Sequence, residues 1–260
     1  MTSPAIQLHL DAAQLLAKGE YSRCLQVSFE ALRILREVFA ESEQREDDEQ
    51  MTDTTCTNSF FVEDGGSIVP GGVSLQMASL DTSSILLFDQ ALVMDVSNAA
   101  EKSQPRSDQR RHELLTACIL YNAGLCYHAM ALQQHQQDAA SRLFPQALHM
   151  YHTAFSLLTD STAAAEEEDD ENAEDAYTSH SSLSLLLLSL ALCNNMASIH
   201  GHFFRWQEAS QLLDCMSFLI QESATIPEDD EDESMTELLT FFMVSCQLFS
   251  PSAFVVAAAA

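Results

Sequence analysis

The sequence predicts an all-α protein built from antiparallel helix pairs, and three observations lead to this fold class. Apolar residues fill 47% of the 260 positions, enough for a sizeable core, and Leu and Ala, both strong helix formers, dominate them. Glycine and proline number only 7 and 6, too few for a turn-rich β sandwich or for Gly-rich phosphate loops. Apolar residues also recur at helical spacing in blocks that acidic or Gly/Ser-rich stretches separate.

The first helix pair is expected at about residues 4–40. Apolar residues follow a helical period over residues 6–16, Gly19 interrupts it, and the period resumes over residues 24–38. The interruption is short, so the two helices should fold back on each other.

A long insertion is expected to follow at residues 41–84, which are first acidic and then rich in Gly, Ser and Thr, a composition typical of loop or disorder. The next stretch, residues 84–95 (SILLFDQALVMD), is long enough for three helical turns, but its Phe and Val content and flanking loops favour extended structure. We expect it to pair with the apolar residues 60–62 in one short β-hairpin. Residues 97–108 are expected to be a linker.

Two further helix pairs are expected at about residues 112–158 and 183–221. The second pair should break near residues 133–141, with Pro145 at the start of its second helix, where proline is tolerated. The third pair should divide at about residues 201–205.

The remaining segments complete a single helical domain over residues 1–260. A final apolar helix is expected at 235–249, and acidic loops at 160–180 and 222–234. These loops and the long insertion should lie outside the helical core.

The formal net charge of −28 restricts the partners. Three runs, residues 41–49, 166–175 and 228–233, hold 20 of the 39 acidic residues. Nucleic acids and anionic membranes need Lys and Arg to neutralise phosphate, so we expect neither as a partner. The runs also lack the alternating ligands and central Gly of a calcium loop. A neutral or basic protein or peptide is the expected partner.

Seven cysteines, without any C-x-x-C spacing, indicate free thiols in a reducing compartment. The first residues lack the basic region and apolar stretch of a secretory signal. The longest apolar run, residues 183–193, is short for a membrane span and is interpreted as buried helix. We therefore expect an intracellular location, the cytoplasm first and the nucleus as the alternative.

Three segments share a register of small residues. Two antiparallel helices approach closely only where one presents Gly, Ala or Ser, and larger residues fill the space between such points. The residues that follow this register are Ala12, Gly19, Tyr21 and Ala31 in the first pair, Gly124, Tyr127, Ala147, Tyr151 and Ala154 in the second, and Ala197, His200, Trp206 and Ala209 in the third.

The segments AAQLLAKGEYSRCL, NAGLCYHAMA with QALHMYHTAF, and NMASIHGHFFRWQEA resemble the tetratricopeptide repeat, and the layout is similar to that of tetratricopeptide-like proteins of unicellular algae. The resemblance covers about 120 of the 260 residues. It implies an α-solenoid-like stack of helix pairs. The motifs at Ala12, Gly124 and Ala197 are 112 and 73 residues apart instead of tandem, so either the insertions loop out or the stacking is irregular.

The resemblance also implies a groove, lined by the first helix of each pair, that takes extended or helical peptides. On this register its lining residues are Cys118, Tyr121, Asn122, Leu125 and His128 of the second pair and Asn194, Asn195, Ser198 and His202 of the third. Asn122 and Asn195 share a register position where the family often places an asparagine that hydrogen-bonds a peptide backbone. Alternatively, both asparagines bond neighbouring helices or cap a turn. The Lys and Arg residues with which some family members clamp a terminal carboxylate are missing at these positions.

Catalytic and metal signatures are not found in the sequence. It contains no G-x-S-x-G, P-loop or G-x-G-x-x-G motif. His200 and His202 point to nearly opposite faces of a helix, and His149 and His152 lack a third ligand nearby. We expect no catalytic residue, no cofactor and no bound metal. We interpret the chain as a non-catalytic protein–protein interaction module that binds a neutral or basic protein partner through the helical groove or through the acidic loops. The alternatives are a Cys/His-based enzyme or metal-binding helical domain, and an architectural subunit of a larger complex.

Overall fold

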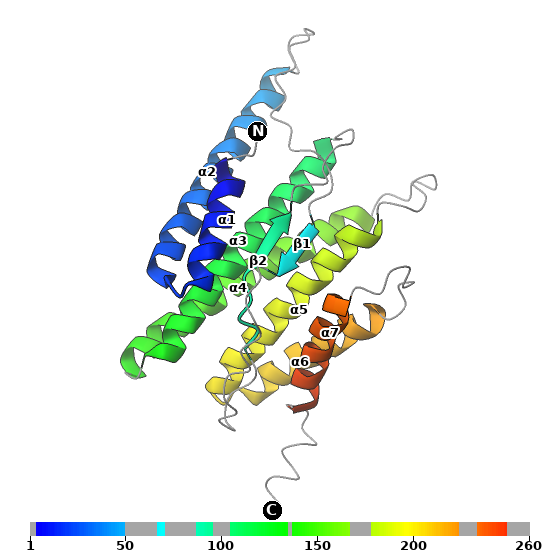
Figure 1. The fold of residues 1–260 in the computed structure, drawn as a ribbon. Helices are drawn as coiled ribbons and strands as arrows, with labels where there is room; N and C mark the ends of the chain where they lie inside the picture. The colour runs from blue at the N-terminus through cyan, green and yellow to red at the C-terminus, as the bar shows by residue number, and fades with distance from the viewer. Residues whose placement is uncertain are drawn as a thin grey trace, which may run out of the picture.

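The computed structural model describes residues 4–49, 67–70, 87–95, 105–134, 137–166, 178–223 and 233–248. Helices make up 90% of the described residues, which confirms the all-α class. The helices within this part of the chain are α1 (Pro4–Ala17), α2 (Tyr21–Glu49), α3 (Pro105–Gln133), α4 (Gln137–Glu166), α5 (Thr178–His202), α6 (Trp206–Ser223) and α7 (Glu233–Leu248) (Figure 1).

The helices pack as consecutive pairs and as a row. α1 packs on α2, α3 on α4 and α5 on α6, and α7 packs on α6 and α5. The odd-numbered helices also contact one another in order, α1 with α3, α3 with α5 and α5 with α7. The row of odd-numbered helices carries the candidate site.

Two short turns reverse the chain within pairs. Gly19 has φ 72°, and the Glu20 N–H donates to the Leu15 carbonyl at 2.9 Å, as in a left-handed helix C-cap. Phe204 takes the same role between α5 and α6 with φ 58°, and there the Arg205 N–H donates to the His200 carbonyl at 2.9 Å.

Small residues lie at the helix crossings, as the register predicts. Those that are buried include Ala12, Ala31, Gly124, Ala147, Ala154, Ala197 and Ala209. The approach is close at Gly124 in α3, where an added Cβ would lie 2.6 Å from Cε1 of Tyr151 in α4. These positions set how closely each pair packs.

Several helices are longer than the sequence indicates. α2 continues through Glu49, so residues 41–49 are helical although their acidic composition predicted loop. Glu, Gln and Arg are good helix formers, and this stretch is rich in them. α3 begins at Pro105, inside the expected linker, and α4 ends at Glu166 while α5 begins at Thr178, so the loop expected at 160–180 is partly helical.

Pro145 lies inside α4 and not at its start, since α4 begins at Gln137. The proline removes one backbone N–H from the helical ladder. Its side chain is exposed, so the ring meets solvent and not the core.

Two short strands accompany the helices. β1 (Ser67–Pro70) and β2 (Leu92–Asp95) pair antiparallel, with Ser67 opposite Asp95 and Pro70 opposite Leu92. Of the extended structure expected at residues 84–95, Leu92–Asp95 is confirmed as strand, and residues 87–91 are neither helix nor strand. Its partner is β1; residues 60–62, the expected partner, lie outside the described residues.

Two helix segments, Arg111–Gln133 and Ser184–His202, have the length and hydropathy of a membrane span, but 78% and 89% of these stretches are buried inside the protein. Core helices have the same properties. The cysteines in the described residues are free; Cys24, Cys118, Cys126 and Cys193 are buried, and Cys215 and Cys246 are partly exposed.

Candidate functional site

A segment of the chain itself, residues 87–95, lies across the row of odd-numbered helices, and we call it the strap. At one end Phe88 packs on α7, with ring centroids 5.0 Å from Phe242 and 5.7 Å from Phe241. At the other end the Met94 N–H donates to Nε2 of His9 in α1 at 3.4 Å. The strap therefore reaches from α7 to α1.

Two buried asparagines hold the strap by its backbone. In α5, Asn195 Oδ1 accepts the Phe88 N–H at 3.0 Å, while its Nδ2 donates to the Phe88 carbonyl at 2.9 Å. In α3, Asn122 Oδ1 accepts the Leu92 N–H at 3.0 Å, and its Nδ2 donates to the Leu92 carbonyl at 2.8 Å. Each amide side chain satisfies both main-chain groups of one strap residue, as a neighbouring strand would.

Tyr121 in α3 adds a third polar contact. Its hydroxyl lies 3.2 Å from the carbonyl oxygens of both Phe88 and Gln90 and can donate to either. Asn195 Nδ2 is 3.4 Å from the same hydroxyl. Tyr121, Asn122, Asn195 and His9 together form what we call the strap site.

The backbone contacts alternate along the strap. Every strap residue whose N–H or carbonyl meets the strap site is even-numbered: Phe88, Gln90, Leu92 and Met94. Successive peptide groups of an extended chain point to opposite edges, so this edge faces the helices and the other edge of β2 faces β1. The helices thus take the place of a further strand.

The distance to be spanned explains the extended conformation. Phe88 to Met94 is six residues, which cover about 20 Å when extended and only about 9 Å in a helix. Packed helices lie about 8–10 Å apart, so the two steps from α5 to α3 and from α3 to α1 need about 20 Å. Only an extended chain places Phe88 at α5 and Met94 at α1.

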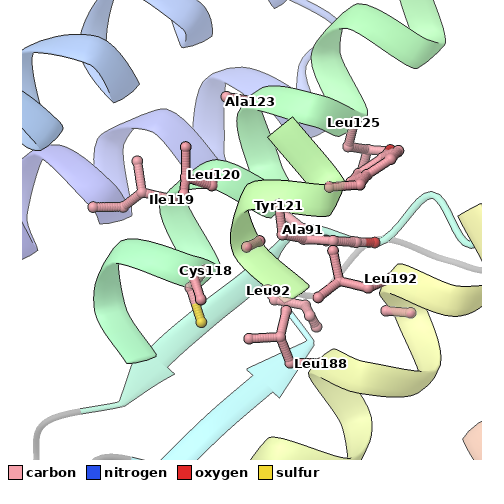
Figure 2. Close-up of a cluster of buried hydrophobic side chains, with 14 of the residues drawn as sticks. Ala91, Leu92, Cys118, Ile119, Leu120, Tyr121, Ala123, Leu125, Leu188 and Leu192 are labelled. Atoms are coloured by element: carbon pink, nitrogen blue, oxygen red, sulfur yellow. The ribbon is translucent and has the colours of Figure 1, made fainter. Parts of the chain in front are cut away.

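The strap also contributes to the apolar core. Phe88 and Leu92 are fully buried, and Ala91 and Met94 nearly so. Figure 2 shows Ala91 and Leu92 between side chains of α3 and α5, with Leu188 and Leu192 on the α5 side. Leu87, Asp89 and Val93 remain partly exposed. The strap is therefore held by apolar burial as well as by its backbone.

Of the nine residues expected to line a groove, three hydrogen-bond the strap: Tyr121, Asn122 and Asn195. Asn194 Nδ2 donates to Asn195 Oδ1 at 3.3 Å and so helps to orient that side chain. Also buried on α3 and α5 are Cys118, Leu125, His128 and Ser198.

His128 and His202 lie elsewhere than expected. His128 is six residues after Asn122, about 240° around the helix, and its ring packs on Phe144 and Tyr151 of α4. His202 is exposed at the end of α5, two turns beyond Asn195, and its ring lies 4.5 Å from that of Phe144. Neither hydrogen-bonds the strap among the contacts of the described residues.

The sequence interpretation did not include His9 among the site residues. It also did not predict that residues 87–95 of the chain itself would occupy the site. The register position of Asn122 and Asn195 falls on Leu10 in the first pair, and the neighbouring His9 supplies the contact instead. A signal was present, because the large residues Phe88, Leu92 and Met94 are all even-numbered, the alternation of a half-buried strand.

The strap site is electrically neutral. Its hydrogen-bonding side chains are two amides, a phenol and an imidazole, and burial lowers the pKa of His9 to about 4. Burial also raises the pKa of Tyr121 well above its ordinary value, so the phenol stays protonated. On the strap, partial burial raises the pKa of Asp89.

We expect His9 to make stability depend on pH. The pKa of about 4 in the folded state lies below the unfolded value of 6.5, so the unfolded chain binds a proton that the folded chain excludes. The stability gained by burying neutral His9 is complete above pH 6.5 and is lost as pH falls toward 4, and it amounts to about 3 kcal/mol. Urea unfolding at several pH values should show a shallower pH slope for His9→Gln, which retains an acceptor. An unchanged slope in His9→Gln would contradict the assignment.

Among the described residues, no three His, Cys, Asp or Glu side chains are placed to hold a metal ion. No protein-family model, curated protein or solved structure matches the chain.

Proposed function

We propose that the chain is a non-catalytic, intracellular protein–protein interaction module of the tetratricopeptide-like class, and that the strap site binds an extended peptide segment of a partner. One observation carries the proposal: Asn122 and Asn195 each bond both the N–H and the carbonyl of a single residue in an extended chain. Such contacts recognise backbone, so they are available to any segment in the same register, as in strand addition to a sheet edge.

The packing of the helices supports the tetratricopeptide-like class. Helices contact within consecutive pairs, and the first helices of the pairs contact one another in a row. Small residues are buried where helices cross. An irregular α-solenoid with its insertions looped out has these features.

The partner segment should be largely apolar, and the partner residues around it should be neutral or basic. The strap site presents no charged side chain to the strap, and the strap buries Phe88, Leu92 and Met94. The three acidic runs of the sequence would repel an acidic partner and attract a basic one. This chemistry also disfavours nucleic acid and anionic membranes as partners.

A peptide titration tests the proposal. The probe is a fluorescein-labelled peptide of residues 85–97 with Asn in place of Asp89, added to the full-length Phe88→Ser/Leu92→Ser variant, whose own strap is weakened. We expect saturable binding, measured by anisotropy, that changes little between about 50 mM and about 500 mM salt because the contacts are neutral. Replacing the acids of residues 228–233 by Ser and Gln should leave the affinity unchanged.

Backbone methylation supplies a matched control. N-methylation of the peptide at the Phe88 and Leu92 positions removes the two N–H donors that the asparagines accept, and should abolish binding. N-methylation at the position of residue 89, whose N–H makes no hydrogen bond to the strap site among the contacts of the described residues, should be tolerated. Equal binding by both methylated peptides would show that Asn122 and Asn195 do not recognise backbone.

An architectural subunit is the second candidate, favoured by exposed apolar residues on α7. Met243, Val244 and Leu248 are 43%, 39% and 45% exposed, and Val244 and Leu248 lie one helical turn apart. Such a patch is typical of a contact with another subunit. The titration separates the two, because a purely architectural subunit would not bind the peptide.

A further inference from the structure

We infer that the strap is an internal ligand that keeps the strap site closed, and that a partner's extended segment with the same spacing of apolar residues displaces it. The inference rests on the proposed function and adds its regulation and the sequence class of the partner. It follows from the connectivity of the strap, the kind of contacts it makes and the side chains it buries.

The connectivity lets the strap leave without parting the helices. α2 and α3 pack directly on each other, yet residues 50–104, 55 in all, lie between them in the sequence. Packed helices are commonly joined by about two to eight residues. The connection is therefore far longer than the fold needs, and release of the strap need not change how α2 meets α3.

The polar contacts of the strap to the helices are those of a ligand. On the strap they use main-chain N–H and carbonyl groups, and on the helices they use side chains of α1, α3 and α5. A second segment can replace these contacts one for one. The N–H groups of Phe88, Leu92 and Met94 are all bonded, so a replacing segment cannot have proline at these three positions.

The buried strap side chains define the partner's sequence class. The segment needs a large apolar residue at the position of Phe88, a small residue three positions later, a leucine-sized residue four later and a methionine-sized residue six later, as in Phe88, Ala91, Leu92 and Met94. The partly exposed positions between them can vary.

Asp89 is the strap residue at which a neutral side chain would suit the strap site better. Its carboxylate is partly buried near the strap site, and burial raises its pKa, so holding the charged form there costs free energy. A segment with a neutral residue at this position avoids that cost. A partner can therefore bind more tightly than the strap and still use the same contacts.

Anisotropy titrations with the labelled peptide of residues 85–97 that carries Asn for Asp89 test the inference. Three full-length proteins are compared: wild type, the opened variant Phe88→Ser/Leu92→Ser, and the matched control Leu132→Ser/Phe218→Ser, which makes the same exchanges at exposed positions. We expect the opened variant to bind at least about 10-fold more tightly than the other two, because a site that is open for a fraction of the time has an apparent Kd raised by that fraction.

The outcomes separate the inference from the proposed function. Equal affinity of wild type and the opened variant would show that the strap does not close the site, while the site itself stands. Binding to neither protein would overturn both. If the opened variant loses its helical circular dichroism, recovery on adding peptide would support exchange, and no recovery would show that the strap is a permanent part of the core. A wild-type dimer that the peptide dissociates, measured by sedimentation, would identify a second copy's strap as the occupant and overturn the partner segment.

Discussion

The double variant Asn122→Ala/Asn195→Ala is expected to lose about 3–9 kcal/mol of unfolding free energy. Removing the amides leaves the N–H of Phe88 and both main-chain groups of Leu92 without their partners, while the Phe88 carbonyl keeps the Tyr121 hydroxyl. A buried polar group without a partner costs about 1–3 kcal/mol. Because whole domains are stable by only about 5–15 kcal/mol, urea unfolding followed by circular dichroism should resolve this loss easily.

An exposed amide on the same row of helices provides the control. Gln7 in α1 bonds only the exposed Asp11 at 3.1 Å, so Gln7→Ala should change stability by less than about 0.5 kcal/mol. Hydrogen exchange adds a local measurement, since the amides of Phe88 and Leu92 should be protected in wild type and exchange rapidly in the double variant. A double variant as stable as wild type would mean that the strap does not occupy the site in solution.

The helices were predictable because their signals are local. Apolar periodicity locates each pair, and the small residues at Gly124 and Ala197 mark where helices cross. Helix ends were less predictable. Residues 41–49 combine an acidic composition, which suggests a solvated loop, with residues of high helix propensity, and the helical preference prevails in α2.

The site was predictable in part. The resemblance implied that Asn122 and Asn195 bond the backbone of a bound peptide, with bonds to neighbouring helices or a turn as the alternative; in the structure they bond the backbone of the chain's own strap. That backbone lies 30 residues from Asn122 and 107 from Asn195, and no local pattern encodes such a pairing. The strap itself was ambiguous between helix and strand because its local pattern fits both. The distance between α5 and α1 favours the extended conformation, and this distance is set only when the protein folds.

Gly124→Leu is expected to lower the unfolding free energy by at least about 3 kcal/mol, and Gly124→Ala by about 2 kcal/mol. A single added Cβ would already lie 2.6 Å and 2.8 Å from ring carbons of Tyr151, which is fully buried. Tyr151 also contacts the strap site, because its hydroxyl lies 3.5 Å from Asn195 Nδ2. Displacing it should therefore loosen the strap as well as the crossing of α3 and α4.

The sign of the change in stability on Gly124→Ala shows whether packing or helix propensity prevails at this position. In a helix interior without a clash, Gly→Ala stabilises by about 0.5–1 kcal/mol, so propensity and packing predict opposite changes. We expect the packing cost to prevail, with a melting temperature lowered by about 4–8 °C in a chain of this size. In a Tyr151→Leu background the ring is gone, and the same exchange should become neutral or stabilising, a coupling that a double-mutant cycle measures. A higher melting temperature for Gly124→Ala alone would show that α3 and α4 do not cross closely at Gly124.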